Sequence, residues 1–426
     1  MNQLKLRQTA IVWFTAGIIY LAHAQKIEVT PAAVMIDEPV SVLVSGVAPG
    51  ARVTIRAELT DGGGHPWAAE AEFVADAQGM VNTASQAPVK GSYRIVSAMG
   101  LLWSMRSTVR DVHRYEPPHA LGPQISRFHL LLDGKEVSSA ELVQSTVRPD
   151  VKQMDLNGDL HGVLFVPASA GKHPGILVVG GSEGGTPGSR AAWLASHGYV
   201  ALALCYFHCP GTPPTLQNIP LEYFGLALGW MAQRPEVAAD RLAVMGTSRG
   251  GELALQLGSM YPAIKAVVAY VPANVRYPSC CGQRLGAAWT WKGEPLAWSA
   301  PWLNAGPPAA VGASIEVEHT NGPILMIGGE ADGVWPSAQM ADAAADRLRR
   351  SHFAHPVVVL KYDHAGHRAG LPEFIPTWSN GVPHPISGQI TEFGGTPEGN
   401  AESTLDAIPK VLDFLQKNLS PESAAN

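Results

Sequence analysis

Residues 244–252 read Val-Met-Gly-Thr-Ser-Arg-Gly-Gly-Glu and contain the pattern Gly-x-Ser-x-Gly at positions 246–250. This pattern is typical of a sharp turn between a strand and a helix that exposes a serine nucleophile. The apolar run Leu242–Met245 predicts the strand, and Glu252–Met260 has apolar positions at helical spacing. Glycines suit the turn because residues without a Cβ let it close and let a substrate approach. The segment therefore predicts Ser248 as a nucleophile.

Two partners for Ser248 follow in the order acid then histidine, which is the order found in α/β-hydrolases. Asp332 comes after an apolar run at 323–328, and His367 comes after another at 356–362. A histidine can remove the serine proton, and a carboxylate can orient that histidine and stabilise its charged form. We therefore expect Asp332 to be the acid and His367 the base. The alternatives in the same loops are Glu330 and Asp363 as the acid and His364 as the base.

A glycine-rich run, Gly180-Gly181-Ser182-Glu183-Gly184-Gly185, follows a further predicted strand. In this fold class the loop after that strand provides one backbone N–H group to the oxyanion of acyl transfer, and the residue after the nucleophile provides the other. The predicted oxyanion hole is therefore the backbone of Arg249 with that of Gly181 and Ser182. The run lacks the features of a phosphate-binding loop or a dinucleotide fingerprint, so nucleotide binding is disfavoured.

Strands and helices alternate over residues 141–420, the region that carries these motifs. Helical patterns at 189–197 and 221–233 lie between short apolar runs, and this order predicts a mostly parallel sheet with helices on both faces. The interval 272–322, rich in Trp, Pro and Gly, is expected to form loops or a small cap over the carboxyl end of the sheet. The predicted strands are 175–180, 200–205, 241–246, 263–270, 323–328 and 356–362.

The preceding residues, 25–140, have short β-type runs separated by Gly, Pro and Asp. These runs predict an all-β sandwich. We expect this module to have a supporting role, because nothing in it assembles a nucleophile with a base. The stretch 111–150 is expected to be a connection with one or two strands of its own, and the boundary is placed within about ten residues of position 140. The predicted strands are 40–44, 52–59, 69–74 and 92–96.

The first 24 residues have the pattern of a signal peptide. Lys5 and Arg7 precede an apolar stretch at 10–21, and Ala22-His23-Ala24 resembles a cleavage site. We expect a periplasmic or secreted protein, with an uncleaved N-terminal anchor as the alternative. No other stretch is apolar for long enough to suggest an integral membrane domain.

Composition points to a small-molecule partner. The formal net charge is −6 and the basic residues are scattered, so a nucleic-acid partner is not expected. No metal site or cofactor is predicted, since neither the histidines nor the cysteines show metal-ligand spacing. The cysteines allow three disulfide connectivities, and buried free thiols or a single bridge are both compatible with the pattern; they are Cys205, Cys209, Cys280 and Cys281. The sequence does not predict the oligomeric state.

Further motifs occur in one order across the chain: 40–44, Gly46-Val47-Ala48-Pro49, Met99-Gly100-Leu101-Leu102-Trp103-Ser104-Met105, Ile219-Pro220-Leu221-Glu222-Tyr223-Phe224, the 246–250 turn, Asp332 with Trp335-Pro336-Ser337, and Gly366-His367. With them, the chain resembles the acyl-CoA thioesterase and bile acid-CoA:amino acid N-acyltransferase family over almost everything after the leader. The resemblance implies an immunoglobulin-like sandwich followed by an α/β-hydrolase domain. It also implies hydrolysis of fatty acyl-CoA to free fatty acid and CoA, through an acyl-enzyme on Ser248 that water resolves.

Three departures from the family pattern bear on this expectation. Ala331-Asp332 stands where the family often has two acids, which leaves Asp332 as the acid of that pair. Ser248 stands where the transferase members typically carry cysteine, which favours water over an amino-acid acceptor. The leader would export the enzyme away from intracellular acyl-CoA. The rival functions are an exported carboxylesterase or dienelactone-type hydrolase, an acyl-CoA:amino acid N-acyltransferase, and an inactive lipid-binding protein.

Overall fold

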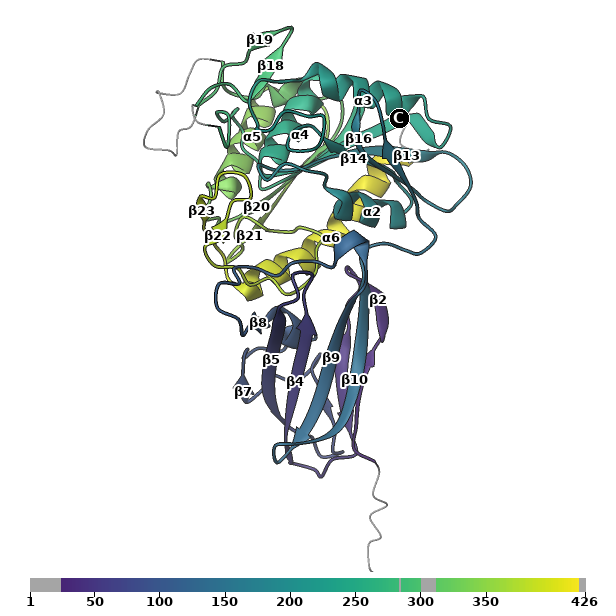
Figure 1. Cartoon of the computed structure of the whole chain (residues 1–426), viewed down its shortest axis with the longest axis vertical. Helices are drawn as coiled ribbons and strands as arrows, with labels where there is room; N and C mark the ends of the chain where they lie inside the picture. Colours follow the sequence, from purple (N-terminus) through teal and green to yellow (C-terminus); the bar gives the residue numbers. More distant parts are fainter. Residues whose placement is uncertain (1–23, 283–284, 300–311, 421–426) are drawn as a thin grey trace, which may run out of the picture.

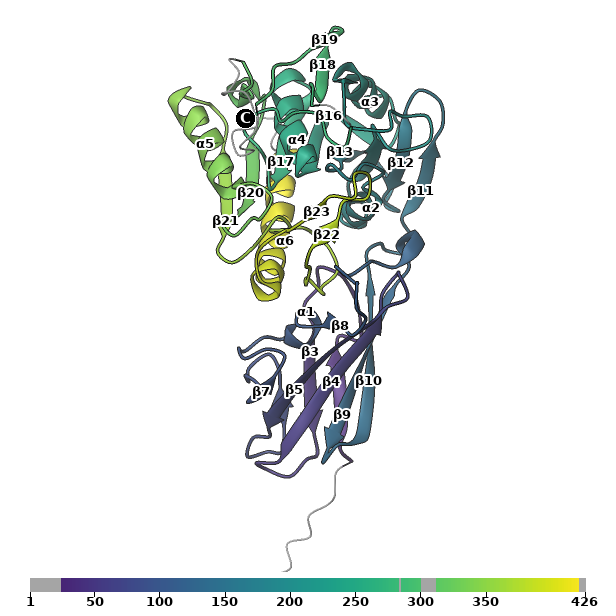
Figure 2. The same cartoon turned by 60° about the vertical axis from the view of Figure 1, so that its left-hand side comes forward.

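A computed structural model of the chain describes residues 24–282, 285–299 and 312–420. An elongated β module and a larger α/β domain follow one another along the chain and form the two ends of the molecule (Figures 1 and 2). The predicted signal peptide lies outside the described residues, apart from its last position. No helix within the described ranges is both long and apolar enough to cross a membrane.

The β module consists of two sheets whose inner faces share one apolar cluster. Side chains of the two long strands β4 and β5 alternate between buried and exposed positions, which is the period of a strand with one face in a core. All strand pairs are antiparallel except β2 with β10. The first sheet contains β1 (Lys26–Thr30), β3 (Ser41–Ser45) and β6 (Val81–Asn82); the second contains β2 (Ala33–Met35), β10 (Lys135–Ser145), β9 (Gln124–Leu132), β4 (Arg52–Thr60), β5 (Pro66–Val74), β7 (Lys90–Gly91) and β8 (Arg106–Ser107).

One prediction about the strands of this module needs correction. The strand expected at 92–96 is not formed: the ladder ends with β7 at Gly91, and the chain continues as a loop into the one-turn helix α1 (Gly100–Trp103). Tyr93 is buried against Trp103, with ring centroids 5.5 Å apart, so its burial comes from a local aromatic pair. The domain boundary, expected within about ten residues of position 140, stays a prediction; β10 ends at Ser145 and β11 begins at Lys152. Most of β10 is exposed or half-buried and lacks a strong apolar alternation that would mark its end.

The α/β domain is built on one eight-stranded sheet. Its five successive pairs from β14 to β21 are parallel, and the pairs β11–β12 and β12–β14 are antiparallel. This confirms the prediction of a mostly parallel sheet. The spatial order is β11 (Lys152–Leu156), β12 (His161–Val166), β14 (Val200–Cys205), β13 (His173–Val179), β16 (Val237–Thr247), β17 (Ile264–Tyr270), β20 (Ile324–Gly329) and β21 (Val357–Tyr362).

Helices cover both faces of this sheet. Alternate residues of β13 enter two different apolar clusters, Ile176 in one and Leu177 in the other. The cluster of Ile176 also holds side chains of α2 (Gly188–Ser196) and α6 (Pro397–Leu419), and the cluster of Leu177 holds those of three further helices. These three are α3 (Glu222–Ala232), α4 (Arg249–Met260) and α5 (Ser337–Arg350).

Short irregular elements complete the domain. The described part of 272–322 contains loops, a 3-10 turn at Val317–His319, and strands β18 (Trp289–Trp291) and β19 (Glu294–Pro295), which join β15 (Ile219–Pro220) in a small sheet. A hairpin of β22 (Val382–Pro383) and β23 (Ile390–Thr391) lies between β21 and α6. Another 3-10 turn, His119–Leu121, precedes β9.

Aromatic side chains join the two parts of the molecule. Trp67 of β5 packs edge-on against Trp378, with ring centroids 5.9 Å apart, and Tyr115 packs against Phe374 at 6.0 Å. The guanidinium of Arg106 lies 5.5 Å from the centroid of the Trp378 ring. The β module therefore contacts the chain segment that follows His367.

Candidate active site

Ser248 lies at the turn between β16 and α4, where the sequence predicts it. Its φ of 60° and ψ of −120° lie outside the regions that most residues adopt, so the backbone is strained at this position. A Cβ on Gly246 would overlap the carbonyl oxygen of Gly250, and a Cβ on Gly250 would overlap that of Gly180. Both flanking glycines are therefore required for the turn to pack as it does.

Ser248, His367 and Asp332 form one continuous chain of hydrogen bonds. His367 Nε2 lies 2.8 Å from Ser248 Oγ, and His367 Nδ1 lies 2.8 and 3.0 Å from the two carboxylate oxygens of Asp332. The carboxylate also accepts the backbone N–H groups of Val334 at 2.9 Å and Trp335 at 3.2 Å. The Asp332 side chain is fully buried, and these three donors, His367 Nδ1 and the two backbone N–H groups, fix its orientation.

The alternative acids and base lie elsewhere. The side chains of Glu330, Asp363 and His364 are in exposed residues, and Glu330 is 3.8 Å from the ammonium group of Lys361. The backbone carbonyl of His364 accepts a hydrogen bond from Thr396 N at 2.8 Å, which is a structural contact. The structure thus brings together the three residues preferred from the sequence.

A segment that the sequence analysis did not single out joins the acid loop to the base loop. The carbonyl of Phe393 accepts the N–H groups of His367, at 2.7 Å, and Gly333, at 3.2 Å. Gly394 has a φ of 72°, and a Cβ there would overlap the carbonyl oxygen of Ala331. The Gly-Gly pair at 394–395 was the available sequence signal, because adjacent glycines mark positions of close backbone approach.

Aromatic rings surround the His367 imidazole. Trp335 packs edge-on against it, with centroids 5.0 Å apart, and Phe393 lies 6.2 Å away on a tilted plane. Trp335 in turn contacts Tyr277 at 4.9 Å and donates its indole N–H to the carbonyl of Val271 at 3.1 Å. These contacts restrict the ring orientation and shield the imidazole from bulk water.

The glycine-rich loop approaches Ser248 from β13. A Cβ on Gly181 would lie 3.3 Å from the Cβ of Ser248, which shows how closely the loop passes. Gly181 N donates to the Glu183 carboxylate at 3.3 Å. The N–H groups of Ser182 and Arg249, by contrast, make no hydrogen bond to an acceptor in the part of the chain that the structure describes. Ser182 and Arg249 therefore offer the two N–H groups available to a ligand.

The side chain of Arg249 has a separate structural role. It is buried, and its Nε lies 3.0 Å from a carboxylate oxygen of the buried Glu252. Arg249 also donates to the carbonyls of Pro278, at 2.6 Å, and Tyr277, at 3.0 Å, while Glu252 accepts the indole N–H of Trp289 at 2.6 Å. Burial raises the pKa of the Glu252 carboxyl, and the charge of Arg249 opposes that rise. This network ties the start of α4 to the loop after β17.

All four cysteines are paired, which corrects the expectation of free thiols or one bridge. Cys205 is bonded to Cys209, and Cys280 to Cys281, so no free cysteine remains within the described ranges. Both pairs are close in sequence, and composition alone could not distinguish them from other connectivities. Cys280, Cys281 and His384 lie together at a spacing suited to a metal ion, but both sulfur atoms are used in the disulfide.

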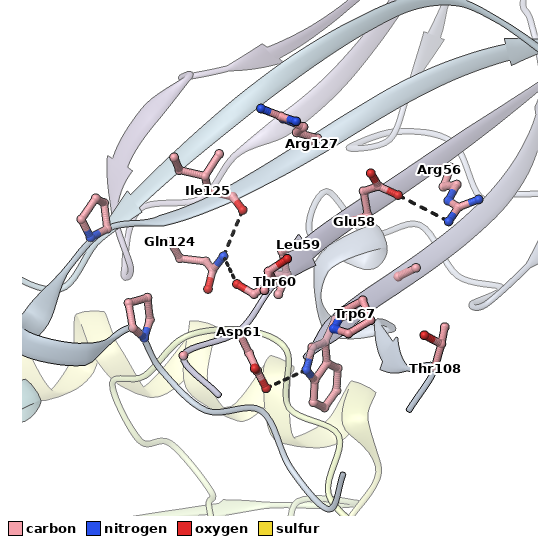
Figure 3. A pocket seen from close by; sticks show the side chains of 15 residues that line it. Arg56, Glu58, Leu59, Thr60, Asp61, Trp67, Thr108, Gln124, Ile125 and Arg127 are labelled. Atoms are coloured by element: carbon pink, nitrogen blue, oxygen red, sulfur yellow. Dashed lines mark hydrogen bonds and ion pairs between the residues drawn. The ribbon is translucent and has the colours of Figure 1, made fainter. Parts of the chain in front are cut away.

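A hollow lies in the β module, away from Ser248 (Figure 3). It has a volume of about 520 Å³ and is lined by residues of β4, β5 and β9 and the neighbouring loops. Trp67 donates its indole N–H to Asp61 at 2.9 Å, and Gln124 donates to the carbonyl of Thr60 at 3.1 Å. The polar groups at its floor are thus already engaged within the protein.

Both parts of the chain match known protein families. Residues 37–158 match the family described as acyl-CoA thioester hydrolase/BAAT N-terminal region, and residues 219–280 and 306–421 match BAAT/acyl-CoA thioester hydrolase C terminal. Acyl-coenzyme A thioesterase 6 of Homo sapiens is 30% identical over 399 residues, covering 90% of this chain and 94% of that protein. Mitochondrial acyl-coenzyme A thioesterase 2 of Mus musculus is 29% identical, covering 91% and 88%.

Solved structures are similar to about two thirds of this chain. A putative dienelactone hydrolase from Klebsiella pneumoniae superposes with a TM-score of 0.42 at 18% identity, covering 63% of this chain and 98% of that one. A hypothetical protein from Pseudomonas aeruginosa superposes with a TM-score of 0.41 at 16% identity, covering 64% and 95%.

Proposed function

Because this chain belongs to the acyl-CoA thioesterase and BAAT family, we propose that it hydrolyses acyl thioesters, converting fatty acyl-CoA to a free fatty acid and CoA. The observation that carries the proposal is the hydrogen-bonded chain from Ser248 through His367 to the buried Asp332. A small-molecule substrate and no cofactor are needed for this chemistry.

The first half-reaction forms an acyl-enzyme. His367 Nε2 accepts the hydroxyl proton as Ser248 Oγ attacks the thioester carbonyl. The carbonyl oxygen becomes an oxyanion, which the N–H groups of Ser182 and Arg249 stabilise by hydrogen bonds. The tetrahedral intermediate collapses, the C–S bond breaks, and the CoA sulfur leaves with the proton returned from His367.

The second half-reaction releases the acid. His367 Nε2 takes a proton from a water molecule, which attacks the acyl carbonyl, and the same oxyanion site stabilises the second intermediate. Breakage of the bond to Ser248 Oγ then regenerates the hydroxyl and frees the fatty acid. Asp332 stays ionised throughout, keeps the proton of His367 on Nδ1 in the neutral ring, and stabilises the imidazolium.

Two domains and an export signal complete the proposal. We assign residues 25–140, extended by the remainder of β10, to an immunoglobulin-like sandwich, and the residues from 152 to about 420 to an α/β-hydrolase domain. The pattern of residues 1–24 supports a periplasmic or secreted location, with a retained anchor as its alternative. That same pattern favours a second candidate function, an exported carboxylesterase or dienelactone-type hydrolase with the same three residues.

Release of free CoA thiol from acyl-CoAs of increasing chain length tests the proposal, run beside p-nitrophenyl esters of matched length. Wild type is compared with Ser248→Ala and with Ser351→Ala. The second is a matched change at an exposed serine that directly follows α5. We expect thiol release to require Ser248, to exceed ester cleavage, and to be unchanged in Ser351→Ala.

The rival functions give different results in the same assay. Ester cleavage without preference for thioesters supports the exported esterase. Formation of an N-acyl amino acid when glycine or taurine is added supports the N-acyltransferase, although Ser248 in place of cysteine favours water as the acceptor. Absence of Ser248-dependent turnover of every substrate overturns the enzymatic proposal in favour of an inactive lipid-binding protein.

A further inference from the structure

A histidine outside the Ser248–His367–Asp332 chain contacts the glycine-rich loop. His384 lies just after β22, and its Nε2 atom is 3.2 Å from Ser182 Oγ. His384 is more than 200 residues from Ser182 in sequence, so the contact depends on the hairpin that carries it. That hairpin is closed by hydrogen bonds between His384 and Gln389 and between Gly381 and the Glu392 carboxylate.

The surroundings of His384 define which nitrogen carries its proton. Its Nδ1 atom is 3.3 Å from each of the backbone nitrogens of Ile386 and Ser387, both of which are donors. A nitrogen that accepts from N–H groups is unprotonated, so the hydrogen of the neutral ring is on Nε2 and points toward Ser182 Oγ. Burial lowers the pKa of His384, which supports the neutral form, while the charge of Glu183 opposes this effect.

The backbone of Ser182 lies in van der Waals contact with a disulfide. The Sγ atom of Cys281, within the Cys280–Cys281 disulfide, lies 3.8 Å from the Ser182 carbonyl oxygen and 3.7 Å from His384 Nε2. The preceding residue is fixed by the bond from Gly181 N to the Glu183 carboxylate. The hydrogen bond to its hydroxyl group therefore restrains Ser182, and its N–H group makes no bond to a described acceptor.

We propose that His384 is a positioning residue for the oxyanion hole: by donating its Nε2 hydrogen to Ser182 Oγ, it holds the Ser182 N–H group where the oxyanion forms. This inference rests on the proposed function, because it assigns Ser182 N as an oxyanion donor. His384 itself does not touch the reacting atoms. An N–H group only slightly displaced from the oxyanion loses much of its effect, because the interaction is directional and acts in a site shielded from water.

The test compares His384→Ala, His384→Gln and Ser182→Ala in the full-length protein. Loss of a whole oxyanion donor typically lowers kcat by about 100- to 1,000-fold, and a displaced donor should lower it by roughly 10-fold. We expect that smaller loss in kcat for His384→Ala, with KM within about twofold of wild type. His384→Gln should recover most of the activity, because its amide N–H can donate to Ser182 Oγ.

A transition-state analogue gives a second readout. A trifluoromethyl ketone forms a tetrahedral adduct with Ser248 whose oxygen occupies the oxyanion hole, so its affinity should fall by the same factor as kcat/KM. The effects of His384→Ala and Ser182→Ala should not add in the double variant, since each change removes the same hydrogen bond. His355→Ala, in the loop between α5 and β21, is the matched control and should behave as wild type.

Failure of the inference can be distinguished from failure of the proposed function by the rate at which a fluorophosphonate inactivates Ser248. That reaction uses the oxyanion hole but needs no natural substrate. Slower inactivation of His384→Ala supports the inference even if no thioester is hydrolysed. Unchanged kcat and unchanged inactivation in His384→Ala, or losses that add fully with those of Ser182→Ala, overturn it. If His384→Ala does not fold, Ser182→Ala and His384→Gln still decide between these outcomes.

Discussion

His367 Nε2 lies 2.8 Å from Ser248 Oγ although the two residues are 119 positions apart in the chain. The contact follows from the sheet: Ser248 comes directly after β16, and His367 follows β21, the outermost strand of the sheet. Parallel strands place their carboxyl ends along one edge, so loops that are distant in sequence meet there. Asp332 follows β20, so it also lies at the carboxyl ends of the strands and can reach His367.

Asp332→Asn should lower kcat by about 10³- to 10⁴-fold, because an amide no longer holds His367 in the required tautomer or stabilises its charged form. Folding should be retained, which circular dichroism can check. Glu330→Gln, a matched change at an exposed carboxylate two residues away, should leave kcat within about twofold of wild type. Equal losses in the two variants would contradict the role of Asp332.

Separate substitutions of the two histidines in one loop show which of them is the general base and which has only a structural role. His367→Ala should lower kcat by at least about 10³-fold, since the general base is lost. His364→Asn should retain nearly full activity, because His364 contributes its backbone carbonyl and asparagine tolerates its φ of 60°. The reverse ranking of kcat in these variants would identify His364 as the base.

Trp378→Ala should affect both stability and activity. Removal of the indole leaves a gap against Trp67 and removes the contact with Arg106, so we expect a loss of about 2–3 kcal/mol in the free energy of unfolding. Activity should fall as well, because Trp378 belongs to the chain segment that follows His367. Trp378→Phe should recover part of the lost stability and part of the lost activity. Trp291→Ala, a half-buried tryptophan of the small sheet, is the control: a similar fall of kcat there would argue for a general effect of lost packing.

Asp37→Asn tests the contact between Asp37 and His197, which joins the two parts of the molecule. Asp37 Oδ2 lies 2.9 Å from His197 Nε2, and although burial alone would raise the pKa of Asp37, His197, the backbone and Trp193 lower it overall. A carboxylate with a lowered pKa stabilises the fold above its unfolded pKa of about 3.9 and loses that contribution as the pH falls.

Urea unfolding at several pH values measures this contribution. Asp37→Asn should cost about 2 kcal/mol near pH 6, and the difference from wild type should shrink as the pH is lowered toward 2. Asp413→Asn, which removes an exposed pair with Lys417, should cost about 0.5 kcal/mol or less at every pH. A cost for Asp37→Asn that does not depend on pH would mean that the carboxylate charge is unimportant there.

Local features of this chain could be predicted from its sequence. The turn at Ser248 depends on a strand, two glycines and a helix within a few residues, and all of these are visible in the sequence. Asp332 and His367 could be chosen because each follows an apolar strand in the expected order. Alternation of strands and helices was sufficient to predict the parallel sheet, since each short apolar run carries the same signal of burial on both faces.

The parts that were missed depend on contacts between distant segments. Phe393 joins the acid and base loops through its carbonyl group, which any residue type could supply, so its side chain gives no signal. His384 reaches Ser182 only because a hairpin brings it there. The pairing of Cys280 with Cys281 could not be read from the spacing of four cysteines. The end of β10 was missed because that strand is polar and largely exposed.

The contact between Trp67 and Trp378 limits how this protein can be recombined with its relatives. A chimera that exchanges only the β module would set a foreign surface against residues 374–380, and the mismatch would be transmitted to the loop of His367. Successful grafts should therefore carry these seven residues together with the module, although about 230 positions of sequence separate the two pieces. For the same reason, a change at one side of this interface is expected to require a compensating change at the other during divergence.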